Sequence, residues 1–290
     1  MPYHRRRALV PLAFALITTS AVVAYVLSDS AEAPLVLAPE LPAVEAPPLP
    51  PSTDPIALPG QQTLRSERDA IAQRFATDVP DEERKTLARR AMEVQRAFLV
   101  NRPDPGEADL YKIRKGDTLG RIAGRYPTRK GLSGGILLLN GRRATDILQV
   151  GRLLRIPRGR WSILVDRSAF ELYLCHRGAP FKSYRVAVGA GKSTPCTSFE
   201  VDDKVQKPMW WPPRSTGLRG PIPYGDPRNQ LGEWWIGLQH KAHKGFGIHG
   251  TNAPDSLGTA SSLGCVRMLN AEVAEVASVA HSGMAVRIVE

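Results

Sequence analysis

His249 and Cys265, 16 positions apart, carry the side chains that cysteine-based acyl transfer requires. A neutral thiol is a poor nucleophile, so such chemistry needs an imidazole to take its proton and N–H donors for the oxyanion that develops. Gly264 and Cys265 offer backbone N–H groups beside the thiol. An arbitrary His/Cys pair is more often buried structural packing, so the surrounding residues must decide between the two interpretations.

Those surroundings resemble the signature of the L,D-transpeptidases, the YkuD-type cell-wall enzymes with a cysteine nucleophile. The resemblance is centred on Ile248-His249-Gly250-Thr251 and on Ser262-Leu263-Gly264-Cys265-Val266-Arg267. Further segments match in the expected order, namely Val186-Ala187-Val188-Gly189, Ser193-Thr194-Pro195, Asn229-Gln230-Leu231-Gly232 and Val286-Arg287-Ile288. Residues 161–290 are therefore expected to form the catalytic domain.

The resemblance implies a role for each reactive residue. Cys265 is expected to attack the L-centre carbonyl of meso-diaminopimelate in a tetrapeptide stem, releasing D-alanine and leaving a thioester. His249 is the expected base, oriented by the carbonyl of Gly250. The amides of Gly264 and Cys265 are the expected oxyanion donors. No metal or other cofactor is implied, and neither is ATP.

Three residues of the same motifs are candidates for contact with the substrate: Arg267, Ser262 and Thr251. A guanidinium suits the carboxylate of a stem peptide, although a structural ion pair beneath the loop would equally account for Arg267. Leu263 departs from the pattern, because relatives frequently carry a histidine there.

The acceptor of the acyl group stays open at this level. A second stem peptide would make the protein a cross-linking enzyme, water an L,D-carboxypeptidase, and a protein amine an enzyme that anchors proteins to the wall. A non-catalytic peptidoglycan-binding membrane anchor is the alternative from another class.

A zinc site is a weaker hypothesis for the same region. His240, His243, His249 and Cys265 are suitable ligand types, but Lys241 and Lys244 would repel the cation. The other two cysteines, Cys175 and Cys196, are compatible with either a disulfide or two free thiols.

The formal net charge of +11, from 39 Lys and Arg against 28 Asp and Glu, favours an anionic partner. Charge alone does not choose between nucleic acid, phospholipid and cell wall. Because the chain has no long basic stripe interleaved with aromatic residues, nucleic-acid binding is disfavoured.

The N-terminal 33 residues indicate export. Arg5-Arg6-Arg7 precede an uncharged, mostly apolar run from Ala8 to Leu27. Such a run is long enough to cross a hydrocarbon core of roughly 30 Å as a helix. Residues 1–33 are thus expected to be an inner-membrane anchor, with a cleaved signal as the alternative, and the later residues are expected to be periplasmic or otherwise extracytoplasmic.

The next two segments are a tether and a helical hairpin. Residues 34–60 are rich in proline and alanine, which favours extended spacing over a packed core. Residues 61–102 contain two apolar patterns at helical spacing that predict a helical hairpin, for which we expect a packing role, with partner binding as an alternative. The Pro- and Gly-rich stretch that begins at Asn101 ends the second helix.

Residues 109–158 resemble LysM modules, with a strand, two short helices and a strand. Tyr111-Lys112-Ile113-Arg114-Lys115-Gly116-Asp117-Thr118-Leu119 carries the resemblance, and Thr118 is suited to cap the first helix. The resemblance implies binding to glycans that contain N-acetylglucosamine, here peptidoglycan. One departure is the glycine-rich, basic segment 127–135, and the alternative is a module that packs against the catalytic domain and binds no sugar.

The catalytic domain is expected to be mainly β, as a β-sandwich or closed sheet. Residues 162–166 and 169–174 alternate around a turn and predict a hairpin, and residues 184–188 predict another strand. Residues 271–280 predict a helix, and residues 287–289 a strand that closes the sheet.

Overall fold

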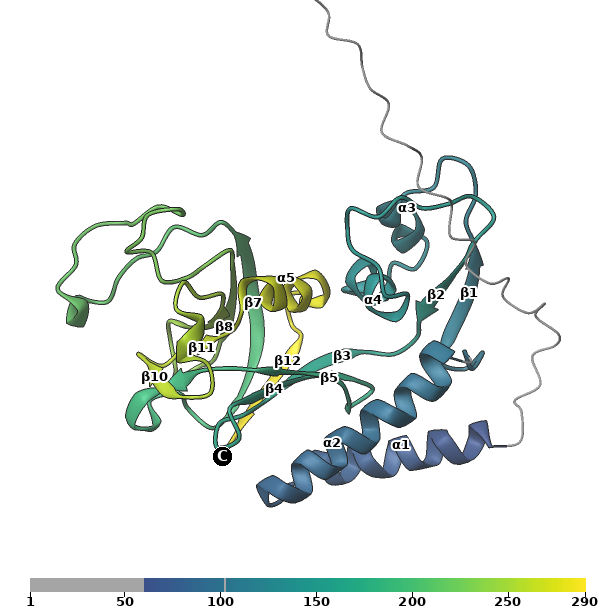
Figure 1. Cartoon of the computed structure of the whole chain (residues 1–290), viewed down its shortest axis with the longest axis horizontal. Coiled ribbons are helices and arrows are strands. Elements are labelled where there is room, and N and C mark those ends of the chain that lie inside the picture. The colour runs from purple at the N-terminus through teal and green to yellow at the C-terminus, as the bar shows by residue number, and fades with distance from the viewer. Residues whose placement is uncertain (1–59, 102) are drawn as a thin grey trace, which may run out of the picture. The chain divides into compact units, whose positions relative to one another are not determined.

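The computed structural model of the chain describes residues 60–101 and 103–290 (Figure 1). The predicted membrane segment 1–33 and all of the predicted tether 34–60 except Gly60 lie outside these residues. Within the described residues, no helix has both the length and the apolar character needed to span a membrane.

The N-terminal part of the described chain is helical and is followed by a small module with two strands. The helical part contains α1 (Gln61–Phe75), α2 (Asp81–Gln95) and a π-helical extension (Arg96–Asn101). The small module contains β1 (Ala108–Lys112), α3 (Leu119–Gly124), α4 (Leu132–Leu139) and β2 (Leu153–Pro157).

The C-terminal part is rich in strands. Its strands are β3 (Trp161–Asp166), β4 (Glu171–His176), β5 (Ala179–Arg185), β6 (Val188–Gly189), β7 (Ser198–Gln206), β8 (Trp234–Gln239), β9 (Phe246–His249), β10 (Ala260–Ser262), β11 (Val266–Arg267) and β12 (Ala285–Val289). Its helix is α5 (Asn270–Val279), and short 3-10 turns lie at Ala190–Lys192, Arg214–Thr216 and Pro254–Ser256.

Eight strands form one mixed sheet in the order β11-β9-β8-β7-β12-β3-β4-β5, and β10 pairs with β6 in a separate ribbon. The pairs β12–β3 and β11–β9 are parallel, and the others in the main sheet are antiparallel. The domain is thus mainly β, as predicted. The strand at 285–289 is an interior strand between β7 and β3, so it joins the two halves of the sheet.

The middle of the sheet is covered on both faces because successive side chains of a strand point to opposite sides. Ile163 and Val165 of β3 belong to the large core that also contains Val276 of α5. Leu164, between them, packs in a second cluster with Phe75 of α1. The sheet therefore has α5 on one face and the helical hairpin on the other.

The helical hairpin packs onto the strand-rich C-terminal domain through polar contacts as well. Arg84 of α2 forms an ion pair with Asp166 at the end of β3, with Nε and Oδ2 2.9 Å apart and both side chains fully buried. Gln95 donates to the carbonyls of Ala179 and Pro180 at 2.7 and 2.8 Å. The packing role predicted for residues 61–102 agrees with these contacts.

The small module has the strand–helix–helix–strand order expected from the sequence. β1 and β2 are antiparallel, and Thr118 caps α3 by accepting from the N–H of Arg121 at 3.2 Å. Its own core contains Ile122, Ile136 and Ile156.

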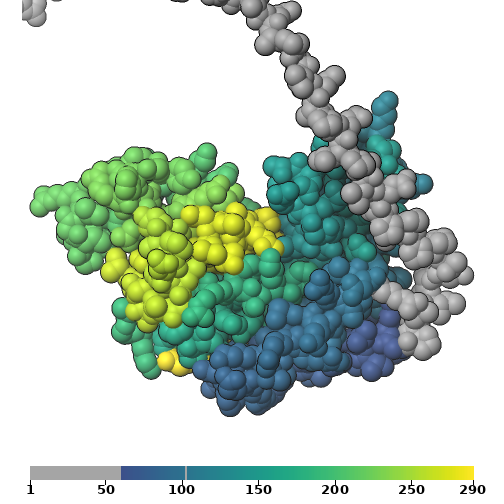
Figure 2. Space-filling model, viewed as in Figure 1, coloured from purple at the N-terminus to yellow at the C-terminus, as the bar shows by residue number. Residues whose placement is uncertain are grey.

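The glycine-rich departure in this module has a packing reason. A Cβ at Gly134 of α4 would overlap the backbone and side chain of Ser278 in α5, and one at Gly131 would overlap the carbonyl of Val279. Small residues therefore let α4 lie directly against α5, which is visible in the contact between the teal and yellow atoms of Figure 2.

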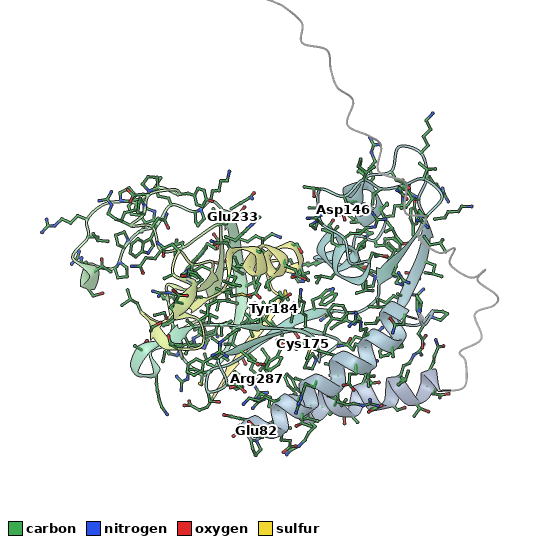
Figure 3. All side chains as sticks on the ribbon, viewed as in Figure 1. Glu82, Asp146, Cys175, Tyr184, Glu233 and Arg287 are labelled. Atoms are coloured by element: carbon green, nitrogen blue, oxygen red, sulfur yellow. The ribbon has the colours of Figure 1, made fainter. Side chains whose placement is uncertain are left out.

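The three cysteines are free thiols. Cys175 is buried in β4, as the stick view in Figure 3 locates it, whereas Cys196 is exposed. Of the two alternatives for this pair, the structure has the free thiols.

Candidate active site

Strand register brings the two reactive residues to one side of the sheet. β11 lies parallel to β9, with Val266 opposite Ile248 and Arg267 opposite His249. Because side chains alternate along a strand, Cys265, just before β11, projects to the same side as Arg267 and His249. The 15 intervening residues thus place the thiol and the imidazole on neighbouring segments.

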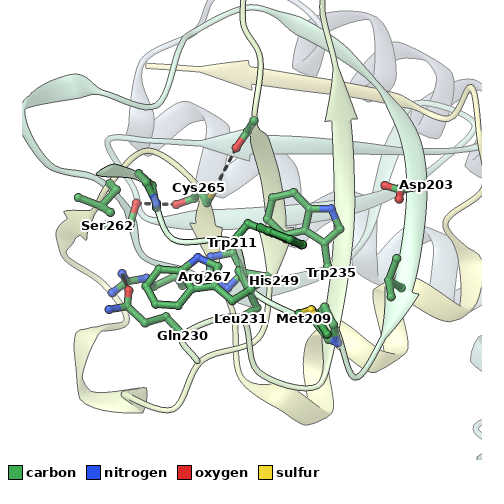
Figure 4. Close-up of a pocket in the computed structure, with 16 residues that line it drawn as sticks. Asp203, Met209, Trp211, Gln230, Leu231, Trp235, His249, Ser262, Cys265 and Arg267 are labelled. Atoms are coloured by element: carbon green, nitrogen blue, oxygen red, sulfur yellow. Dashed lines mark hydrogen bonds between the residues drawn. The ribbon is translucent and has the colours of Figure 1, made fainter. Parts of the chain in front are cut away.

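Both side chains line a cavity of about 560 Å³ (Figure 4). Its other lining residues come mainly from the ends of β7 and β8 and the long segment between them: Asp203, Val205, Pro208, Met209, Trp210, Trp211, Pro213, Gln230, Leu231, Trp235, Gly245, Ser262, Leu263 and Arg267. The cavity is mostly apolar, with polar groups concentrated around Cys265 and Arg267, as is typical of a site that orients a ligand.

His249 is held as a neutral imidazole. Its ring is buried, stacks on Trp235 with centroids 5.9 Å apart, and has Nδ1 2.6 Å from the carbonyl oxygen of Gly250. Since a carbonyl only accepts, Nδ1 carries the proton and Nε2 is the basic nitrogen. Burial lowers the pKa of His249 to about 4, against smaller opposing effects of the Gly250 and Leu231 carbonyls.

Gly250 is required at its position for space. A Cβ there would overlap the side-chain oxygen of Asn270, which accepts from the N–H of Glu233, while the Asn270 amide donates to the carbonyl of Thr251 at 3.0 Å. Asn270 therefore fixes the backbone on which the His249 ring depends.

Cys265 is a neutral thiol at rest. Its Sγ donates to the carbonyl of Gly245 at 3.7 Å. Burial raises the pKa of the Cys265 thiol, and the backbone N–H of Gly247 and the charge of Arg267 oppose that shift. The thiol and the His249 ring share the cavity without a hydrogen bond between them, a looseness common in active sites without substrate.

The loop before Cys265 is held by Ser262. The buried Ser262 Oγ donates to the carbonyl of Cys265 at 2.6 Å and accepts from the N–H of Gly264 at 3.0 Å. The Gly264 amide is therefore engaged within the loop, while the N–H of Cys265 makes no hydrogen bond to loop or side-chain acceptors among the described residues. The oxyanion role of Gly264 and the substrate role of Ser262 stay predictions.

Arg267 carries an unpaired charge at the cavity wall. Its Nη2 donates to the side-chain oxygen of Gln230 at 3.2 Å, and its buried Nε has no partner. Within the described part of the chain no carboxylate lies at ion-pair distance from it, so the structural ion pair considered for Arg267 is not formed. Desolvation by burial lowers the pKa of this guanidinium, and a half-buried cation of this kind suits an anionic ligand.

Thr251 lies outside the cavity wall. It is buried, and its Oγ1 accepts from the N–H of Ala253 at 3.0 Å. Its proposed contact with substrate stays a prediction, and the contacts that it does make hold the turn after His249.

Several cavity residues had only weak signals in the sequence. Trp211 is 70% exposed and Leu263 is 59% exposed, both beside the reactive thiol. Tryptophans before the motif suggest a wall, but Trp210 mainly packs on Ile222 and Leu231. Nothing local in the sequence distinguishes the exposed tryptophan from its buried neighbour.

Two of the histidines considered as zinc ligands make a ring stack and backbone hydrogen bonds. His240 and His243 stack on each other with centroids 4.8 Å apart, and His240 Nδ1 accepts from the backbone N–H groups of Ala242 and His243. In residues 60–101 and 103–290, no group of three or more His, Cys, Asp or Glu side chains is arranged to hold a metal ion.

Two family models match the chain in order. The LysM domain matches residues 111–157, and the YkuD L,D-transpeptidase catalytic domain matches residues 160–288. The second match contains every residue of the cavity described above.

Curated relatives cover the same region. The YkuD protein of Bacillus licheniformis, which bears an L,D-transpeptidase name, is 32% identical over 187 residues, or 62% of this chain and 98% of the relative. The YkuD protein of Bacillus subtilis strain 168, with the same name, is 32% identical over 181 residues, or 61% of this chain and 97% of the relative. A solved L,D-transpeptidase from Mycobacterium smegmatis is 17% identical with a TM-score of 0.38, covering 49% of this chain and 65% of that one, and adds nothing to the assignment.

Proposed function

Because this chain belongs to the YkuD family of L,D-transpeptidases, we propose that it forms a thioester between Cys265 and a peptidoglycan stem peptide and passes that acyl group to an amine. The observation that supports this mechanism most is that the Cys265 thiol and a neutral His249 ring line one cavity, because Cys265 directly precedes β11 and β11 lies in register beside β9.

In the first half-reaction the thiol proton moves to Nε2 of His249 as sulfur attacks the L-centre carbonyl of meso-diaminopimelate. The bond to the terminal D-alanine breaks, and the imidazolium returns the proton to the leaving amine. A neutral base suits this step, because at neutral pH His249 is free to accept a proton. The short contact from Nδ1 to the carbonyl of Gly250 disperses the positive charge that His249 gains.

In the second half-reaction a side-chain amine of another stem peptide attacks the thioester, and His249 accepts its proton. The expelled thiolate of Cys265 is then reprotonated from His249, which restores both groups. The donor peptide bond supplies the free energy, so no ATP is consumed. Water or a protein amine in place of the stem peptide would give hydrolysis or protein anchoring from the same thioester.

Arg267 is proposed to bind a carboxylate of the stem peptide. It lines the reaction cavity beside Cys265 and has no carboxylate partner of its own in the described residues. An anionic ligand would relieve the desolvation of its charge. Ser262 is proposed to contribute indirectly, through the loop that it holds.

The LysM module is proposed to hold the enzyme on the glycan strands of peptidoglycan. The family match at residues 111–157 supports this partner. We further propose that the protein acts in the periplasm or another extracytoplasmic space, attached to the inner membrane by residues 1–33. The support is the arginine-flanked apolar run of the sequence.

The test incubates the purified full chain with disaccharide-tetrapeptide and identifies products by mass spectrometry, with Cys265→Ala as the matched control. A dimer joined between two diaminopimelates is the expected product. Tripeptide alone would instead establish an L,D-carboxypeptidase. Absence of turnover by a folded wild-type sample, or equal turnover by Cys265→Ala, would overturn the proposed chemistry.

A further inference from the structure

Thr194 joins two backbone segments beneath the nucleophile. Its side chain is fully buried, and its hydroxyl donates to the carbonyl of Gly264 at 2.8 Å while accepting from the N–H of Gly189 at 2.7 Å. Both hydrogen-bonding functions of the hydroxyl are therefore used between β6 and the loop that carries Cys265. None of the catalytic roles assigned above includes this side chain.

The three segments around this hydroxyl touch through glycines. A Cβ on Gly189 would lie 2.7 Å from the N of Thr194 and 2.8 Å from the Cα of Gly264. Gly264 has a φ of +140°, and a Cβ on it would lie 2.9 Å from the ring of Phe246. Because no Cβ fits at Gly189 or Gly264, the two backbones approach closely enough for the Thr194 hydroxyl to form a hydrogen bond with each of them.

The hydrogen bond to Gly264 has a geometric consequence for Cys265. The carbonyl of Gly264 and the N–H of Cys265 belong to one trans peptide unit, so they point in opposite directions. Holding the carbonyl on the Thr194 side directs the N–H away from it. The N–H of Gly264 already donates to the Ser262 hydroxyl. The N–H of Cys265 is therefore the loop amide that is available to donate to the negative oxygen of the reacting carbonyl.

The turn that carries Thr194 is itself anchored. The nearly buried Arg167 donates through Nη1 to the carbonyls of Thr194 at 2.6 Å and Lys192 at 3.0 Å. The same guanidinium forms an ion pair with Glu290. The hydroxyl of Thr194 is thus presented from a fixed backbone.

We propose that Thr194 is a positioning residue for the oxyanion donor: its hydroxyl holds the Gly264–Cys265 peptide plane so that the Cys265 N–H faces the oxygen that becomes negative during acyl transfer. The inference rests on the proposed function of Cys265. Thr194 is buried outside the lining of the cavity, and its hydroxyl bonds only backbone groups, so it acts through the peptide plane.

The test compares Thr194→Val, which keeps the shape but lacks the hydroxyl, with Thr194→Ser, which keeps the hydroxyl. For transfer from disaccharide-tetrapeptide we expect Thr194→Val to lose about 10- to 100-fold in kcat with little change in KM, since the variant misplaces the oxyanion donor, whereas complete removal of such a donor costs about 100- to 1000-fold. Thr194→Ser should stay within about threefold of wild type because the peptide plane is still held.

Alkylation of Cys265 by iodoacetamide separates positioning from general damage. This displacement at a saturated carbon forms no oxyanion, so its rate should be the same in wild type, Thr194→Val and Thr194→Ser. Equal losses of alkylation and acyl transfer in Thr194→Val would overturn the inference, as would wild-type acyl transfer in that variant or failure of serine to rescue it.

Two additions keep the test decisive. Acylation by p-nitrophenyl acetate, corrected with Cys265→Ala, needs an oxyanion donor but no stem recognition, so it tests Thr194 even if wild type fails to use the stem peptide. If Thr194→Val does not fold, Thr194→Ala replaces it, because the smaller side chain leaves room for a water between Gly189 and Gly264. A loss of at least about fivefold in acylation, with unchanged alkylation, is then expected, and an unchanged acylation rate contradicts the inference.

Discussion

At the scale of single residues, burial decides how the two reactive groups start the reaction. A buried imidazole is neutral over most of the pH range, and a buried thiol keeps its proton to higher pH than an exposed one. His249 and Cys265 both follow this rule. The pair is therefore a neutral acid and a neutral base before substrate arrives, rather than a thiolate–imidazolium pair.

This protonation state predicts an unusual pH dependence. The acid limb of kcat/KM should have its midpoint near pH 4, the pKa of His249, because activity is lost only when the base becomes protonated as pH falls. The rate of Cys265 alkylation should still increase with pH above the pH range in which an ordinary cysteine titrates, because the pKa of Cys265 is raised. A plateau of alkylation near neutral pH, or an acid limb near pH 6.5, would contradict this prediction.

The measurement needs a folding control. His249 and the buried His176 have pKa values lowered to about 4 and about 3, below that of an unfolded histidine. The unfolded chain then binds more protons below pH 6.5, so the free energy of unfolding falls as pH decreases from there. Circular dichroism at each pH separates loss of the fold from protonation of the base.

The unpaired charge of Arg267 predicts a selective effect on substrate binding. Arg267→Met should raise KM for the tetrapeptide by about 10-fold or more, as expected for loss of a charge-assisted hydrogen bond. The rate of p-nitrophenyl acetate acylation should change much less, because that ester has no carboxylate. Equal effects on both substrates would instead indicate that Arg267 only supports the loop.

At the scale of secondary-structure elements, the helical hairpin is held to the sheet by a buried ion pair. Arg84 of α2 and Asp166 of β3 are both without solvent exposure. Removing one member of such a pair leaves an uncompensated buried charge. The hairpin is thus part of the catalytic fold and not an independent segment beside it.

Arg84→Met should lower the free energy of unfolding by about 3–5 kcal/mol. Urea denaturation measures this loss, and Arg84→Met combined with Asp166→Asn should recover part of it. Arg74→Met, which breaks the exposed pair with Glu83, is the matched control and should have little effect. Similar losses in the two single variants would show that burial is not the cause.

At the scale of the whole described unit, close packing joins the LysM module to the catalytic domain. Gly131, directly before α4, and Gly134 of α4 face the end of α5, where no side chain would fit. Within these residues the LysM module and the strand-rich domain share a buried core, because Leu139 of α4 belongs to the same cluster as Val276 of α5.

This contact predicts opposite effects of two Gly→Ala changes. Alanine is favoured over glycine in a helix by about 1 kcal/mol, so Gly120→Ala in α3, with open space around it, should leave the Tm unchanged or raise it. Gly134→Ala should lower the Tm, because overlap with Ser278 costs about 1–3 kcal/mol and exceeds that gain. Calorimetry on both variants checks the prediction, and an increased Tm for Gly134→Ala would contradict it.

Local patterns in the sequence were sufficient for the domain order and for the reactive pair. The LysM-like and YkuD-like motifs each lie within short stretches, and alternation of apolar residues predicted the β3–β4 hairpin. The glycine-rich segment 127–135, in contrast, is a departure from the LysM pattern that local sequence does not explain. Its glycines are explained by α5, which lies more than 100 positions later in the chain.

The sequence by itself therefore determined the family, because neighbouring residues carry its signals, and the same motifs led to the proposal of Cys265 as nucleophile and His249 as base. Only the tertiary structure decided that Ser262 engages the Gly264 amide, that Arg267 has no carboxylate partner in the described residues, and that Thr194 holds the peptide plane of Cys265. The physical reason is that a hydrogen bond or a desolvated charge depends on which distant segments meet, as when Thr194 reaches a carbonyl 70 positions away. Residue types and local spacing do not indicate which distant segments will meet.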